Sequence, residues 1–174
     1  YTMVTGKLAV SPQTVTSMAA QGILRVESYE TYRNPVHFDE LPGEKKKLTE
    51  VQQEIADDFI RSYDAGDRTP VLLHGITGSG KTEVYMEMID AMLQRGKQCI
   101  VLIPEIALTY QTLLRFYKRF GDAVSVMHSR LSAGERYDQM KRAKRGEVQV
   151  MIGPRSALFT PFQKLGLIII DEEH

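Results

Sequence analysis

Cysteine, net charge and long apolar runs are all scarce in this sequence, and each scarcity excludes a kind of protein. The 174 residues include a single cysteine, Cys99, so an intramolecular disulfide and a paired-cysteine zinc site are both excluded. The purest apolar run near the end, residues 165–170, is too short to span a bilayer. No basic-then-apolar leader stands at the start. These features predict a soluble cytoplasmic protein without a membrane partner.

The net charge of the chain is zero as well, because 22 basic residues balance 22 acidic ones. A global positive field that would attract nucleic acid is therefore absent, and any nucleic-acid surface must be local. Apolar residues, by contrast, make up 43% of the sequence, which is enough for a packed core. The length suits one ordinary domain plus a small extra piece, without internal repeats or low-complexity segments.

Residues 1–38 form the first predicted unit. Ser11 is suited to cap a helix whose first residue is Pro12, and Gly22 is placed to end that helix. Residues 23–32 are rich in β-branched and aromatic side chains, which predicts a strand or wing. A helix followed by a wing is typical of the C-terminal part of a winged-helix domain. A packing appendage without DNA contacts explains this stretch equally well.

Apolar and amphipathic segments alternate from residue 48 onward, after a linker rich in proline, glycine and lysine at 39–47. The pattern predicts short strands at 71–74, 99–103, 124–127, 148–152 and 167–170. It predicts helices at 49–63, 82–94, 108–120 and 133–145. Strands that alternate with helices are typical of an α/β fold with a parallel sheet covered by helices on both faces.

The strongest motif spans residues 75–82 and matches G-x-x-x-x-G-K-[ST] in full. A predicted strand precedes it and a predicted helix follows it, which is the context in which such a P-loop binds nucleotide phosphates. Lys81 would reach the β- and γ-phosphates, and Thr82 would ligate Mg²⁺. The residues expected to bind ATP around the backbone of this loop are Gly75, Thr77, Gly78, Ser79, Gly80, Lys81 and Thr82.

A second motif is the Asp-Glu-Glu-His box at 171–174, which directly follows an apolar strand. Ligands of open α/β sheets collect at the carboxyl ends of strands, so Asp171 is expected to hold Mg²⁺ through water. Glu172 is expected to orient and deprotonate the attacking water, which completes a catalytic set with Lys81. His174 would sense the γ-phosphate, couple to a further lobe, or be an ordinary polar loop residue.

Weaker candidates lie outside these two motifs. The amide of Gln52 can both donate and accept, which suits the adenine edge, although a surface helix glutamine is as good an explanation. Arg130 and Arg155 are candidates for contacts with DNA phosphates, and each could instead brace the fold through a carboxylate. Segments expected to place small polar groups at strand ends, where a nucleic-acid strand could run, are 104–109, 128–130 and 153–157.

Five stretches resemble the family of bacterial primosomal DNA helicases, PriA (primosomal protein N′), more specifically than any generic motif. They are LLHGITGSGKTEVYMEMI, VLIPEIALTYQ, VMHSRLSAGERYDQM, IGPRSALFTPF and LGLIIIDEEH. The similarity covers nearly all of residues 48–174, while residues 1–38 are similar to the tail of that family's winged-helix domain. Pro154 departs from the small or hydroxyl residue expected before Arg155.

The resemblance implies a superfamily-2 DEEH-box helicase whose first RecA-like, ATP-binding lobe occupies residues 48–174. Such a protein hydrolyses ATP with Mg²⁺, moves 3′ to 5′ on forked or single-stranded DNA, and restarts replication at the bacterial nucleoid. Primosome and replication proteins are its expected partners. The resemblance also implies that a further strand normally lies between the P-loop strand and the acid-box strand.

Both ends of the chain look cut, so we expect a piece of a longer protein. In the family that protein also carries a zinc domain, a second motor lobe with an arginine finger, and a domain that binds DNA ends. The alternative is that the isolated fragment only binds nucleotide or DNA, or docks a partner, without hydrolysing ATP.

Overall fold

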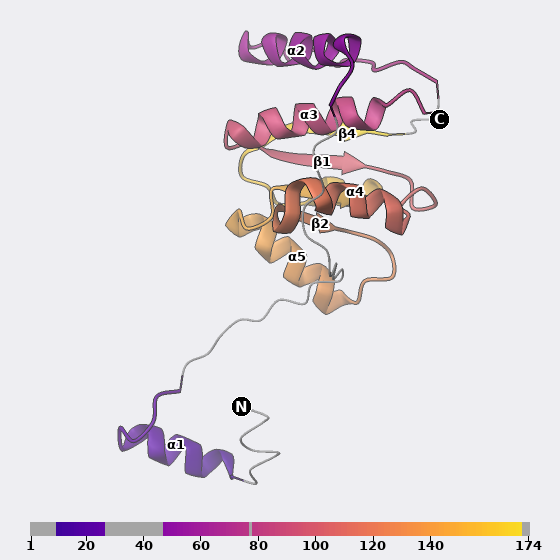
Figure 1. Cartoon of the computed structure of the whole chain (residues 1–174). Helices are drawn as coiled ribbons and strands as arrows, with labels where there is room; N and C mark the ends of the chain where they lie inside the picture. The colour runs from indigo at the N-terminus through magenta and orange to yellow at the C-terminus, as the bar shows by residue number, and fades with distance from the viewer. Residues whose placement is uncertain (1–9, 27–46, 77, 172–174) are drawn as a thin grey trace. The chain divides into compact units, whose positions relative to one another are not determined.

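Four short strands form one sheet in which every pairing is parallel (Figure 1). The computed structural model describes residues 10–26, 47–76 and 78–171. Across the sheet the strand order is β2-β3-β1-β4. The strands are β1 (Gln98–Leu102), β2 (Val124–Val126), β3 (Val150–Gly153) and β4 (Leu165–Ile170).

Helices connect and cover these strands, because parallel neighbours need crossover connections. The α-helices of this unit are α2 (Glu50–Asp64), α3 (Lys81–Gln94), α4 (Tyr110–Phe120) and α5 (Ala133–Arg145). Two 3₁₀ turns complete it, η2 (Gly121–Ala123) and η3 (Arg155–Phe159). The predicted helices are thus confirmed, with boundaries within two residues of those expected.

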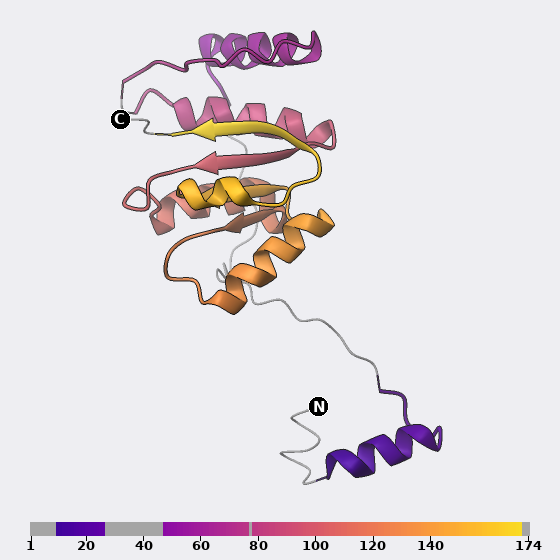
Figure 2. The ribbon, with the colours of Figure 1, turned by 180° about the vertical axis from the view of Figure 1, so that it is seen from behind.

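The core divides into two clusters, one on each face of the sheet. Strand β1 shows why: its side chains alternate, so Cys99 and Val101 enter one cluster and Ile100 enters the other. Helices α3 and α4 build the first cluster, which Figure 1 shows with α4 in front of the sheet. Helix α5 and η3 build the second, and Figure 2 shows them from behind, η3 in gold. The predicted parallel sheet covered on both faces is confirmed.

Capping explains where two of these helices begin. Thr49 starts α2 and Ser132 starts α5, each with a reciprocal bond to the residue three positions on, Gln52 and Glu135. Three ion pairs then hold α4 against α3: Arg115 with Glu83 at 2.6 Å, and Arg119 with Glu87 and Asp90, both at 2.7 Å. Arg119 is only 9% exposed, so its two pairs are better shielded from solvent than the first.

The predicted strand at 71–74 is wrong, because these residues form no ladder with any described strand. Val71 is 61% exposed and Leu72 is 78% exposed, while Leu73 packs against the first cluster. An apolar sequence makes a strand only where a neighbour supplies hydrogen bonds to its backbone. Among the described strands, β4 pairs with β1 alone, and no described segment joins β4 to residues 71–74.

The chain divides into two units, Tyr1–Thr31 and Tyr32–His174. The first contains α1 (Pro12–Ala20), and its predicted cap is confirmed because Thr14 N donates to Ser11 Oγ at 3.1 Å. Its predicted end at Gly22 is confirmed by a φ of 72°.

Residues 23–26, the described part of the predicted strand or wing, form no strand. Residues 27–32 of that prediction lie outside the described residues, as does the predicted linker 39–47 apart from Lys47. Within the described ranges, no helix is both long and apolar enough to cross a membrane.

Candidate functional site

The glycine-rich loop lies between residues 71–74 and helix α3. Ser79 N donates to Ile76 O at 3.2 Å, which closes the turn. Gly78 and Gly80 have φ values of 81° and 86°, in the left-handed region that favours glycine. Both glycines are therefore needed for the path of the backbone. Thr77 lies outside the described residues.

Helix α3 starts directly after this loop, with Gly80 as its N-cap and no side chain capping it. The first N–H groups of a helix have no partner within the helix, and the helix dipole is positive at that end. A loop that brings such an end to the surface is suited to bind an anion, and a phosphate in particular.

Lys81 is the first residue of α3, and its side chain turns back over the loop. Its Nζ donates to Gly75 O at 2.6 Å and to Ile76 O at 3.0 Å. The ammonium group is thus held at the centre of the loop. Gly75 is tightly enclosed, because an added Cβ would lie 2.8 Å from Ser79 Oγ. The loop, the ammonium group and the helix end together fit a polyphosphate.

Gln52 links this loop to α2. Its Nε2 donates to Ser79 O at 3.0 Å, while its Oε1 accepts from Thr49 N at 3.0 Å. A Cβ on Gly80 would collide with the Gln52 amide nitrogen. The side chain assigned to the adenine edge therefore also braces the phosphate loop, which the sequence pattern did not reveal. Its contact with adenine stays a prediction.

Asp171 follows β4, at the carboxyl end of the sheet, where its N donates to Leu102 O at 2.8 Å. Its Oδ2 accepts a hydrogen bond from Tyr85 Oη at 2.9 Å. Thr82 lies three residues before Tyr85, on the same side of α3. Asp171, one of the two residues predicted to hold Mg²⁺, is thus brought to α3 within one turn of the other, Thr82. Glu172 and His174 lie outside the described residues.

Tyr85 is a residue of this site that the sequence analysis missed. Burial raises the pKa of its phenol most, and the nearby Asp171 charge raises it further, while the neighbouring Thr82 side chain lowers it. The hydroxyl consequently stays protonated, and stays a donor, over the physiological pH range. The sequence feature that could have identified Tyr85 is its spacing from Thr82, since residues three positions apart lie on the same side of a helix.

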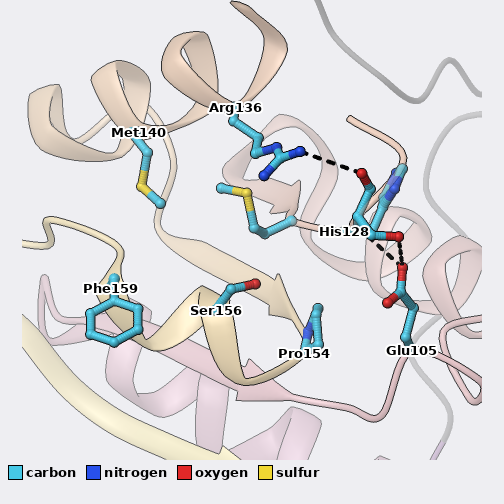
Figure 3. Close-up of a pocket in the computed structure, with 9 residues that line it drawn as sticks. Glu105, His128, Arg136, Met140, Pro154, Ser156 and Phe159 are labelled. Carbon is cyan, nitrogen blue, oxygen red and sulfur yellow. Dashed lines mark hydrogen bonds between the residues drawn. The ribbon is translucent and has the colours of Figure 1, made fainter. Parts of the chain in front are cut away.

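A second polar region lies where β1, β2 and β3 end. There Glu105 accepts hydrogen bonds from Ser129 N at 3.1 Å and from Ser129 Oγ (Figure 3). These bonds lower the pKa of the Glu105 carboxyl below its ordinary value, with a smaller effect from the nearby charges. A pocket of about 420 Å³ opens beside this contact. Its lining is Glu105, Met127, His128, Ser129, Arg136, Met140, Pro154, Ser156 and Phe159.

Arg136 is the arginine that shapes this pocket. Its Nε donates to Leu131 O at 3.0 Å and its Nη2 to Ser129 O at 3.4 Å, so it braces the loop after β2 (Figure 3). Arg130, in the loop after β2, and Arg155, the first residue of η3, are the predicted DNA contacts, and both are exposed. Neither makes an ion pair within 4.0 Å with the described residues, although the charge of Arg130 helps to lower the pKa of the Glu105 carboxyl. Their binding to DNA stays a prediction.

A glycine loop at an open helix end, facing a carboxylate at the end of a parallel strand, defines a P-loop lobe of the RecA-like α/β class. The comparison with known families agrees with that class. The chain belongs to the family described as "Type III restriction enzyme, res subunit", whose model matches residues 45–174. That match also supports ATP, with Mg²⁺, as the ligands that a domain of this kind uses.

Relatives in several bacteria carry the name "Replication restart protein PriA". The one from Bacillus subtilis is 44% identical over 170 residues, which is 97% of this chain and 21% of the relative. The Synechocystis relative is 42% identical over 166 residues, 94% of this chain and 19% of the relative. The Haemophilus influenzae relative is 52% identical over 103 residues, 59% of this chain and 14% of the relative.

These relatives confirm the resemblance to the primosomal helicases that the five sequence stretches indicated. The chain spans about a fifth of the length of the first two.

Proposed function

We propose that this chain is the ATP-binding lobe of a replication-restart DNA helicase that moves 3′ to 5′. The observation that carries the proposal is the approach of Asp171 to the start of α3, beside the glycine loop, where Tyr85 Oη donates to Asp171 Oδ2 one turn after Thr82. A loop built for phosphate and a metal-ligating pair at its end are the parts that ATP hydrolysis requires. The names of the relatives supply the link to replication restart.

Each residue of the site would have a separate task. Backbone N–H groups of the loop and of the start of α3 bind phosphate oxygens, and the Lys81 ammonium group neutralises their charge. Thr82 and Asp171 hold the metal. When bound, Mg²⁺ supplies Lewis-acid stabilisation of the phosphate charge. Glu172 orients the attacking water and accepts its proton.

DNA would bind at the carboxyl ends of β1, β2 and β3, beside the nucleotide site at the end of β4. The loops after β1, β2 and β3 present polar groups there, with Arg130 and Arg155 exposed. Exposed arginines and backbone groups bind phosphates without reading base sequence. This suits a motor that must move along any sequence.

The wider setting of the protein is part of the same proposal. Its partners would be forked or single-stranded DNA and the primosome and replication proteins. It would act in the bacterial cytoplasm, at the nucleoid. Zinc would bind only in a further domain of the family, outside this chain. Activity would require the full-length protein, since ATP would bind between this lobe and a second one.

The test is the DNA-stimulated ATPase of the full-length protein with Lys81→Ala. Loss of the ammonium group should reduce turnover by at least a hundredfold, since charge stabilisation at a transferred phosphoryl group is among the largest catalytic terms. Lys97→Ala, in the turn between α3 and β1, is the matched control and should keep wild-type turnover. Near wild-type turnover in Lys81→Ala would defeat the proposal.

A further inference from the structure

We propose that Tyr85 is a positioning residue that holds Asp171 in register with Thr82, so that the two can share one metal ion. This inference rests on the proposed function and deepens it. It concerns a side chain that would touch neither the nucleotide nor the attacking water. Its role would be exerted through the carboxylate that it hydrogen bonds.

The geometry joins two elements that are far apart in sequence. Tyr85 belongs to α3, and Asp171 follows β4, 86 residues later, yet Tyr85 Oη lies 2.9 Å from Asp171 Oδ2. Leu102 O fixes the backbone of Asp171 at 2.8 Å. The backbone bond sets where the residue lies, and the phenol bond sets which way its carboxylate faces. A hydrogen bond to a charged acceptor is strong enough to select one rotamer.

The hydroxyl can select a rotamer only because its own ring cannot move. Tyr85 is 5% exposed and belongs to the first core cluster. Its ring stacks on that of Phe116, with centroids 6.2 Å apart and planes inclined by 21°. Close packing of this kind holds a side chain in one rotamer. The core of the lobe therefore supplies the rigidity that the metal site needs.

The polarity of the contact also suits a permanent donor. A phenol donates and a carboxylate accepts, so the hydrogen points from Tyr85 Oη toward Asp171 Oδ2. Thr82 lies one turn before Tyr85 on the same side of α3. One rigid helix thus carries both Thr82 and the phenol that orients Asp171. A ligand pair held within a few tenths of an ångström binds metal more tightly than a loose one.

A purely structural role would look similar in the structure, since a buried phenol needs a partner in any protein. The two roles differ in what the loss of the hydroxyl does. A structural hydrogen bond would affect stability alone. A positioning bond would weaken metal-dependent nucleotide binding while metal-free binding stays unchanged.

The experiment uses Tyr85→Phe in the full-length protein, because phenylalanine keeps the ring and removes only the donor. A fluorescent ATP analogue is titrated with Mg²⁺ and again with EDTA. We expect affinity with Mg²⁺ to fall about tenfold, as for the loss of a hydrogen bond to a charged group, and affinity in EDTA to stay unchanged. In the ATPase assay kcat should fall, the Mg²⁺ concentration for half-maximal rate should rise, and excess Mg²⁺ should restore part of the rate.

Tyr117→Phe is the matched control. Tyr117 lies in the same core cluster, is also buried, and has a raised phenol pKa of about 12. The Tyr117→Phe variant should bind the ATP analogue with the same dependence on Mg²⁺ concentration as the wild type. If Tyr85→Phe gives the same Mg²⁺ dependence as Tyr117→Phe, the positioning role is refuted. If the wild-type protein itself fails to bind the analogue, the proposed function fails first and this inference falls with it.

Discussion

Gln52 Nε2 donates to Ser79 O at 3.0 Å, and this bond joins α2 to the phosphate loop across 27 positions of sequence. The same amide accepts from Thr49 N, so one side chain both caps a helix and braces a loop. A loop that is held before its ligand arrives loses less conformational entropy when it binds. The stability of the loop therefore depends on a residue outside the motif.

Gln52→Ala should lower the affinity of the full-length protein for ATP. Loss of the hydrogen bond between Gln52 and Ser79 should make the free energy of nucleotide binding less favourable by about 1 kcal/mol. The affinity for ATP and for GTP should therefore fall alike, by roughly fivefold. The predicted adenine contact should add a further loss for ATP alone. Binding of fluorescent ATP and GTP analogues measures both effects. Equal losses of affinity for the two nucleotides would contradict the predicted adenine contact and would support the role of Gln52 in holding the loop.

Gly80→Ala should destabilise the lobe by about 1–3 kcal/mol, because alanine is strained in the left-handed region. Gly66 has a φ of 88° and open space around it, so Gly66→Ala carries the strain without a collision. Urea unfolding should show a larger loss for Gly80→Ala, whose Cβ meets Gln52. Adding Gln52→Ala to each variant should remove that difference. A difference that persists would show that the collision is not its cause.

Arg130→Ala and Arg155→Ala should each weaken single-stranded DNA binding by roughly two- to fivefold, regardless of base sequence. Each should also lower the slope of affinity against salt concentration by about one, since each arginine would neutralise one phosphate. Fluorescence anisotropy at several salt concentrations measures this. Arg61→Ala, on the exposed side of α2, is the control and should change neither quantity. If the slope of affinity against salt concentration is unchanged in both arginine variants, DNA does not contact Arg130 or Arg155.

Cys99 should react slowly with thiol reagents and should make stability depend on alkaline pH. It is fully buried, and burial raises its pKa to about 12. Because the folded-state pKa exceeds the unfolded one, the stabilising contribution is complete below the unfolded pKa. It is lost as pH rises toward the folded value.

Unfolding by urea between pH 8 and pH 11 tests this dependence. The free energy of unfolding should fall more steeply in the wild type than in Cys99→Ser, by up to about 1.4 kcal/mol for each pH unit. Labelling in urea should be fast in the wild type. Equal slopes in the two proteins, or rapid labelling of the folded wild type, would show that the thiol is accessible to solvent.

How far the sequence predicted the fold depended on the range of the interactions that each element needs. Helix α5 was predictable from Ser132 and Glu135 because a capping box is a contact between residues three apart. Residues 71–74 were predicted wrongly as a strand because a strand needs a partner, and composition does not reveal which segment supplies it. The apolar pattern was correct about burial only at Leu73, which packs on the core.

The site shows the same division. The glycine loop could be predicted from its residues alone, since its glycines, Lys81 and Thr82 are adjacent and their chemistry follows from the backbone path they require. The contacts of Tyr85 with Asp171 and of Gln52 with Ser79 could not, because they join residues far apart in the chain. Such contacts depend on how helices lie against the sheet, and that packing is fixed by the whole core and not by any single segment of the chain.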